Sequence, residues 1–407
     1  FSFDIQYNRF KNPRDVFLKN INFNKTSFSP FVLNLKTPSK KENHIFSDNE
    51  AFNFSLSSNL ELNKLSGFLR QSINQFFNQN RSEQTNSFLN VSVFLKEKFI
   101  KALYPELENP SPIKFEAVLG YSTSKSYVEL NVPFLSTSNY KIESLLLKVD
   151  RNKELLKFDI GTFKNDNFLF KNLKLTTNTD RARRSFLNGL YGENEEKFEI
   201  IFDNKISHNK IKLNFNDVSF YLDRELWKLK DSNSSITYNQ KTKEFNLTNL
   251  YLEGENQSIK TDFRFKSVDN FDLKLVTKNL KLNQFLPKNE KVDLSGFLSS
   301  EIVINQNEEL QNATANIKTK NLFLNQNLIG DFDFVLSGSP IYKTYKLSTS
   351  VINNGRKNIL GTGNIYILDK NINLDIDFDL DKFDLSFLSS FGKNKVNRIH
   401  GILSGKL

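Results

Sequence analysis

The sequence predicts an all-β protein, an elongated and curled antiparallel sheet with an open groove and few or no helices. Three observations predict it. Apolar and charged residues alternate with a period of two, which places them on opposite faces of a strand. The 407 residues include 40 Phe, and aromatic side chains favour pleated sheet. Short polar turn formers separate the alternating runs, as hairpins require.

Breaks in this pattern divide the chain into four expected segments. Residues 1–110 form the N-terminal part of the groove, and a Pro-Ser-Pro sequence at 110–112 separates them from further groove at 111–180. A stretch containing Arg and Gly predicts a loop at 181–194, and 195–407 is the longest groove segment. Because the sequence contains no Met and starts inside an alternating run, we expect it to be an internal fragment.

Helix signals are scarce and short. Residues 95–103 carry apolar side chains at helical spacing and precede Pro105, which predicts one short helix. Residues 74–86 are polar and predict a loop. Trp227, the single Trp of the chain, lies on an alternating segment and carries no specific functional signal.

The clearest strand pattern lies near the C-terminal end of the sequence. From Ile372 to Leu380 every second residue is apolar, and Asp375, Asp377, Asp379 and Asp381 occupy positions between and after them. An extended strand spaces these carboxylates along one line, whereas a calcium loop must curl around its ion. We therefore expect a solvated strand face and no metal site.

A tetrapeptide, Asn-Leu-x-Leu, recurs at or near the ends of alternating runs. Asn tolerates left-handed and bulged backbone, so its recurrence predicts a repeated kink that re-aims the strand. The spacings between copies are irregular, which indicates a drifting array and not a strict solenoid. The copies begin at Asn59, Asn172, Asn249, Asn279 and Asn321.

No catalytic constellation is recognisable, so we expect no enzyme and no cofactor. His44, His208 and His400 stand in unrelated contexts without a metal-binding or nucleophile motif. The absence of Cys excludes disulfides and thiolate sites. The net charge of +10 is scattered along the chain, which is typical of a solvated surface and argues against nucleic acid as a partner. No apolar run reaches the ~18 residues of a transmembrane helix.

Parts of the sequence resemble the TamB (translocation and assembly module) branch of the AsmA-like family of bridge-like lipid transfer proteins. The resemblance covers roughly residues 231–407 and rests on strand patterns, with no active-site residues to carry over. It is carried first by Ser234–Gln240, Phe245–Leu252 and Glu255–Ile259, and continues through 271–282, 292–296, 321–330 and 401–407.

The resemblance implies a periplasmic β-taco, a curled sheet whose apolar groove carries phospholipid between the inner and outer membranes and supports outer-membrane protein assembly. It further implies an inner-membrane anchor before this sequence and an outer-membrane barrel of the BamA/TamA type as a partner after it. The groove-lining candidates are Phe263, Phe265, Leu273, Leu275, Phe332, Phe334, Ile372, Leu374, Ile376, Phe378 and Leu380.

A second architecture fits the same alternation. Apolar strand faces in ordinary domains pack against another layer, and a structural or adhesive array of β-sandwiches with closed cores satisfies that rule. The two alternatives differ in whether the apolar face of the sheet is covered by protein.

Overall fold

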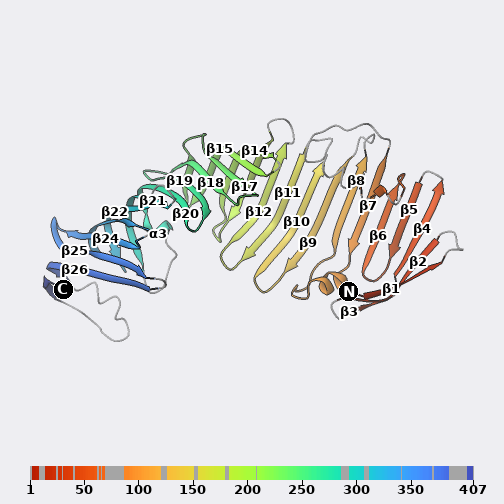
Figure 1. Cartoon of the computed structure of the whole chain (residues 1–407), viewed down its shortest axis with the longest axis horizontal. Coiled ribbons are helices and arrows are strands. Elements are labelled where there is room, and N and C mark those ends of the chain that lie inside the picture. The colour runs from red at the N-terminus through yellow and green to blue at the C-terminus, as the bar shows by residue number, and fades with distance from the viewer. Residues whose placement is uncertain are drawn as a thin grey trace. The chain divides into compact units, whose positions relative to one another are not determined.

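The computed structural model has the predicted all-β, antiparallel fold, and the helices α2 and α3 in its described part are short (Figure 1). Contacts divide the chain into two compact units, 1–199 and 200–407, which are described separately below. The second unit begins at Ile200, five residues after the expected start of the last segment. The structure describes residues 2–8, 14–23, 26–29, 31–39, 42–61, 64–65, 67–68, 87–120, 126–150, 155–178, 183–207, 209–285, 293–306, 311–340, 342–368, 371–384 and 401–406.

Unit 1 is a meander in which successive strands pair antiparallel, except that β3 and β4 both pair with β2. Short connections between sequential neighbours explain this order. The strands are β1 (Ser2–Asn8), β2 (Arg14–Phe23), β3 (Thr26–Phe28), β4 (Phe31–Ser39), β5 (Glu42–Asp48), β6 (Phe52–Ser58), β7 (Phe88–Leu95), β8 (Ile113–Gly120), β9 (Tyr127–Ser136), β10 (Tyr140–Asp150), β11 (Leu155–Asn165), β12 (Leu169–Asn178) and β13 (Arg184–Tyr191).

Unit 2 continues as a second meander after β14 (Glu196–Ser207), which spans the boundary. Its strands are β15 (Lys210–Leu222), β16 (Glu225–Leu229), β17 (Ser235–Asn239), β18 (Phe245–Glu253), β19 (Ser258–Ser267), β20 (Asn270–Lys281), β21 (Leu294–Gln306), β22 (Gln311–Leu324), β23 (Asn327–Ser339), β24 (Thr344–Asn353), β25 (Arg356–Leu368), β26 (Asn371–Asp384) and β27 (Ile402–Lys406). Strands β16 and β17 both pair with β15 and with β18, so they lie end to end in one position of the sheet.

The kink predicted at Asn-Leu-x-Leu is confirmed at four of the five copies. Asn172, Asn249, Asn279 and Asn321 all have φ of 51° or 52°, and each lies where the register shifts by one residue. The extra residue of such a bulge moves the following Leu-x-Leu onto the face that the preceding apolar residues occupy. The fifth copy differs, because Asn59 lies in a bend after β6 and its side chain accepts a hydrogen bond from Phe88 N (2.8 Å).

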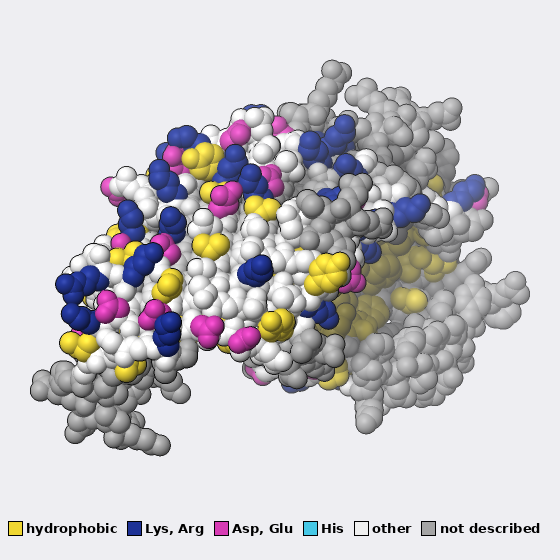
Figure 2. Space-filling model, turned by 60° about the vertical axis from the view of Figure 1, so that its left-hand side comes forward, with side chains coloured by type: hydrophobic (Ala, Val, Ile, Leu, Met, Phe, Trp, Pro, Cys, Tyr) yellow, Lys and Arg dark blue, Asp and Glu magenta, His cyan; other side chains and the backbone are white. Residues whose placement is uncertain are grey.

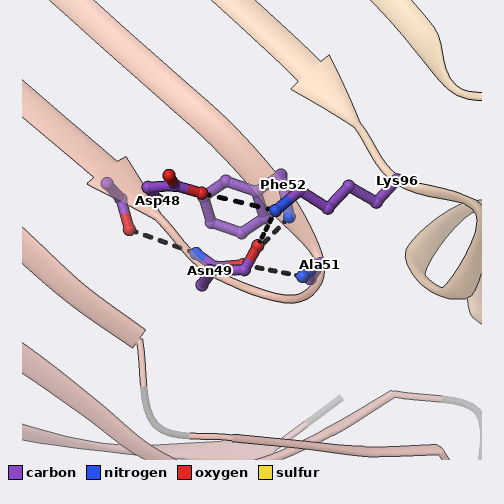
Figure 3. Close-up of polar contacts among 6 residues, drawn as sticks. Asp48, Asn49, Ala51, Phe52 and Lys96 are labelled. Atoms are coloured by element: carbon purple, nitrogen blue, oxygen red, sulfur yellow. Dashed lines mark hydrogen bonds and ion pairs between the residues drawn. The ribbon is translucent and has the colours of Figure 1, made fainter.

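The predicted short helix is also confirmed, as α2 (Glu97–Leu103). It packs Ala102 and Phe99 against Phe28, Ala51 and Phe52 in one of the two core clusters of unit 1. The β5–β6 turn is fastened to the start of this helix, because Lys96 donates to the Asn49 carbonyl and lies 3.3 Å from Asp48 Oδ1 (Figure 3). Asn49 Oδ1 in turn accepts from the backbone N–H groups of Ala51 (2.8 Å) and Phe52 (2.9 Å).

The loop predicted at 181–194 is wrong over most of its length, since Arg184–Tyr191 forms strand β13. The strand pairs with β12, where Thr177 faces Ser185 and Leu175 faces Leu187. Gly189 was a reason to expect a loop, yet it lies in the strand beneath Phe198, whose ring comes within 3.1 Å of where a Cβ atom would stand. Glycine here permits close packing and does not mark a turn.

Candidate functional site

The register places all eleven groove-lining candidates on one face of unit 2. Residues directly opposite each other in antiparallel strands share a face, so the pairing can be followed from strand to strand. One row across β20 to β26 contains Leu275, Ile302, Ala315, Leu336, Leu347, Gly363 and Ile376.

The other candidates fall in parallel rows of the same face, which we call the apolar face. Phe334 shares its row with Phe378, and Phe332 shares its row with Leu380. A further row runs from Phe263 through Leu273, Ile304, Ala313, Gly338, Tyr345 and Ile365 to Leu374. The residues that β21, β24 and β25 contribute to this face are not among the predicted candidates, although Ile302 and Ile304 on β21 show the same two-residue alternation.

The apolar face is half-covered and not sealed. Of the eleven candidates only Leu380 is buried (7% exposed), while Phe265, Leu374 and Ile372 are 37%, 64% and 68% exposed and the rest are intermediate. The main contacts between elements of unit 2 join strands that are neighbours in the sheet, and α3 (Leu282–Phe285) with its flanking strands. Residues between two packed sheets are normally buried, so the described residues place no second sheet over the exposed part of this face.

Aromatic side chains line this face in short stacks. Phe263 and Phe265 are stacked with ring centroids 6.2 Å apart, and Phe332 and Phe334 with centroids 6.4 Å apart. Each pair is two residues apart on one strand, which is the spacing that puts both rings on the same side. The contacts are apolar and lack directional hydrogen bonds, so they suit flexible hydrocarbon.

Two features interrupt the hydrocarbon surface. Thr277 and Ser300 are buried opposite each other and share a hydrogen bond of 2.8 Å, which satisfies both hydroxyls. Gly361 has no side chain, and the ring of Phe378 lies over it, 2.7 Å from the position of a Cβ atom. The hydroxyls of Thr277 and Ser300 therefore need no further partner, and most of the face around them is hydrocarbon.

The opposite face carries the charges. Arg264 and Asp272 are opposite each other on β19 and β20 and approach to 2.6 Å. The four carboxylates from Asp375 to Asp381 are all exposed, which confirms the solvated strand face predicted for them. Figure 2 shows basic and acidic side chains interspersed among uncharged ones on the surface nearest the viewer.

Unit 1 has a comparable apolar face with partial covers. One row runs through Ile45, Leu56, Val91, Ala117, Val128, Val149 and Leu156. Phe68 and Leu65 pack on this face together with Leu89 and Leu119, and α2 covers a second area. The row members on β10 and β11 remain half-exposed.

A polar cluster around Trp227 was not predicted from the sequence. This Trp is fully buried (0% exposed), and it stacks on Phe220 with centroids 6.2 Å apart. Two residues earlier, Glu225 is 9% exposed and forms an ion pair with Lys281 Nζ (2.6 Å). Burial acts to raise the pKa of Glu225, but hydrogen bonds from Lys281, Gln257 and Gln284 outweigh burial and hold the pKa below its usual value. No local motif signals this cluster, because its members lie up to 59 residues apart.

The described residues offer little for other chemistry. They contain no group of acidic, His or Cys side chains able to hold a metal ion. His44 is partly exposed and lies 3.8 Å from Glu42, whereas His208, His400 and the loop expected at 74–86 fall outside the described residues. Within the described ranges, neither α2 nor α3 has the length and apolarity needed to span a bilayer.

Comparison with protein-family models, with curated proteins and with solved structures finds no significant match.

Proposed function

We propose that the chain is a section of a lipid-conducting bridge, in which the apolar face of the sheet shields the acyl chains of phospholipid during passage between two membranes. One observation carries the proposal: the register joins apolar residues from β19 to β26 into one face that the described residues leave half-exposed. A closed β-sandwich array would bury that face, so the burial pattern favours the groove over this alternative.

The energetic benefit of such a face is large. Exposing one acyl chain of ~16 carbons to water costs about 0.8 kcal/mol per methylene, or roughly 12 kcal/mol. Contact with Phe, Leu and Ile side chains removes most of this cost. Because these contacts are weak and non-directional, a chain can slide from one row of side chains to the next.

The resemblance extends the proposal beyond the described residues. It suggests a periplasmic location, an inner-membrane anchor preceding this sequence, and an outer-membrane barrel of the BamA/TamA type as the receiving partner. A role in outer-membrane protein assembly follows from that partnership. Direct binding of the isolated chain to such a barrel, measured by pull-down, tests this part separately from lipid binding.

Ile376→Asp tests the groove itself. A carboxylate in the middle of the apolar face would need desolvation whenever an acyl chain passes, so we expect lipid transfer between donor and acceptor vesicles to fall about tenfold or more. Native mass spectrometry should show less co-purifying phospholipid in the same variant.

A matched control lies one residue away, on the charged face. Asp377→Lys changes the charge by two units without touching the apolar face, and we expect transfer at the wild-type rate. Circular dichroism establishes that both variants are folded. Normal transfer by folded Ile376→Asp would remove the groove assignment.

A further inference from the structure

Helix α3 is a single turn that lies against the apolar face at one rim. Four residues cannot hold a helix in water without outside support, because the first turn gains too few hydrogen bonds to offset its ordering. The support comes from two side chains of the helix. Phe285 meets Trp227 edge-to-face with centroids 5.7 Å apart, and Gln284 hydrogen-bonds to Glu225 (3.2 Å) and Gln257 (3.1 Å).

The register places Trp227 on the apolar face. Leu229, two residues after Trp227 on β16, pairs with Leu252, and Leu252 pairs with Ile259. Ile259 lies on the same side of β19 as Phe263, one of the groove-lining candidates. Phe285 thus covers an aromatic surface that belongs to the groove, and Trp227 is fully buried beneath it.

A polar cluster fastens the helix at this position, and we call its four members, Glu225, Gln257, Lys281 and Gln284, the clasp. Glu225 Oε2 accepts hydrogen bonds from Lys281 Nζ (2.6 Å), Gln257 Nε2 (2.8 Å) and Gln284 Nε2 (3.2 Å). The clasp spans several sheet positions, since β18 and β19 lie between β16 and β20. Charge-assisted bonds are the strongest of these contacts, and Glu225 is their common acceptor.

The closed arrangement is incompletely satisfied. Glu225 Oε1 and Trp227 Nε1 are buried, and no described group hydrogen-bonds to either atom. Both side chains border Gly254, where an added Cβ atom would lie 3.2 Å from Glu225 Oε1 and 3.0 Å from Trp227 Cε2. Buried polar groups without partners carry a desolvation cost, so part of the stabilisation that the clasp provides is offset in the closed arrangement.

From this geometry we infer that α3 is a displaceable cover over a hydrocarbon-binding site on Trp227. Phe285 occupies the place that one acyl chain takes when the clasp opens, and Glu225 holds the cover shut. The inference rests on the proposed function, because it assigns a specific chain-binding position within the same apolar face. The ligand class is a single flexible hydrocarbon chain.

Trp227 is the only Trp in the sequence, so its fluorescence reports on this site alone. The probe is dibromostearic acid, whose bromine atoms quench Trp on contact. The double variant Gln257→Cys and Gln284→Cys, in a chain without native Cys, is joined by a short cleavable thiol crosslinker. We expect Trp227 to be protected in the linked form and quenched after cleavage of the same sample, with circular dichroism unchanged.

Glu225→Gln provides a second variant that needs no crosslink. Loss of the charged acceptor should favour the open state about tenfold, seen as faster quenching of Trp227. Equal quenching in linked and cleaved protein, or an unchanged rate in folded Glu225→Gln, would overturn the cover.

A reporter elsewhere on the face separates the two proposals. Phe263→Trp in a Trp227→Phe background places the only Trp among the groove-lining candidates, away from the clasp. Suppose that this reporter is quenched, while quenching of Trp227 changes neither on cleavage of the crosslink nor in Glu225→Gln. The cover is then wrong and the groove stands. If neither Trp is quenched at any probe concentration, the proposed function fails and the cover fails with it.

Discussion

Single residues determine which face of the sheet each apolar run occupies. At three of the bulges the backbone N–H of the Asn donates a hydrogen bond to a side-chain oxygen on the opposite strand. The pairs are Asn249 with Asp262 (2.6 Å), Asn279 with Ser299 (3.0 Å) and Asn321 with Asp331 (2.9 Å). The recurring unit is therefore an Asn in left-handed backbone plus a short polar acceptor across the strand. It allows the apolar positions to switch from odd to even residue numbers, or the reverse, while the side chains stay on the same face.

Substitution at Asn279 separates backbone strain from side-chain chemistry. Its φ of 51° is unfavourable for residues with a Cβ atom, so Asn279→Ala should lower the free energy of unfolding by about 1 kcal/mol. Asn279→Gly should be nearer to neutral, because glycine adopts this conformation freely. Urea denaturation measures both, and equal losses for Ala and Gly would contradict the strain argument.

Gly361 tests close packing on the apolar face. An added Cβ atom would stand 2.7 Å from the Phe378 ring and 2.8 Å from Thr349 Cγ2. We expect Gly361→Ala to destabilise the protein by about 1–3 kcal/mol in chemical denaturation. Adding Phe378→Leu should recover part of that loss, and a strictly additive double variant would show that the ring is not the obstacle.

At the scale of elements, short helices fasten strand ends at two separate places. In unit 1, α2 adds Lys98, which bonds to Glu50 (3.0 Å) and lies 5.2 Å from the centre of the Phe28 ring. In unit 2, α3 meets Trp227 through Phe285. Both helices are brief and depend on tertiary contacts, since neither is long enough to be stable alone.

The Glu50 contact predicts an acid-sensitive fastening. Hydrogen bonds from Ser29 N–H (2.7 Å) and Lys98 lower the pKa of Glu50 from its usual 4.5 to about 2. A carboxylate with a lowered pKa stabilises the fold above its usual pKa, and that contribution fades as pH falls from about 4.5 towards 2. Thermal unfolding across this window should show the loss in wild type, and a smaller one in Glu50→Gln.

At the scale of the whole chain, each strand depends mainly on its neighbours in the sheet for its stability. Strands of unit 2 make their main contacts with the strands beside them in the sheet, as in repeat proteins whose stability is a sum of nearest-neighbour terms. Damage should therefore remain local within the unit.

Gly363→Ala tests this locality. The new Cβ atom would collide with the Asp375 carbonyl oxygen, so β25 and β26 must separate. Hydrogen exchange should accelerate in β24, β25 and β26, whereas β17, β18 and β19 keep their protection. Uniform acceleration throughout unit 2 would indicate a single cooperative core.

Much of this architecture was accessible from local pattern. The all-β class, a short helix within 95–103, four of the five bulges and the solvated Asp row all follow from alternation, helical spacing or the backbone tolerance of Asn. The loop expected at 181–194 failed because Gly and Arg were taken as turn signals, while the Thr177–Ser185 and Leu175–Leu187 pairings extend the sheet there.

The sequence by itself determined which side of each strand is apolar, because that depends only on the two-residue period of a strand. Only the tertiary structure decided that these sides join into one face, since the pairing of Leu275 with Ile302, and onward to Ile376, requires partners far apart in the chain. The clasp between Glu225 and Lys281 was likewise decided in three dimensions. Its residues meet because the sheet order brings distant strands together, and no local periodicity records that encounter.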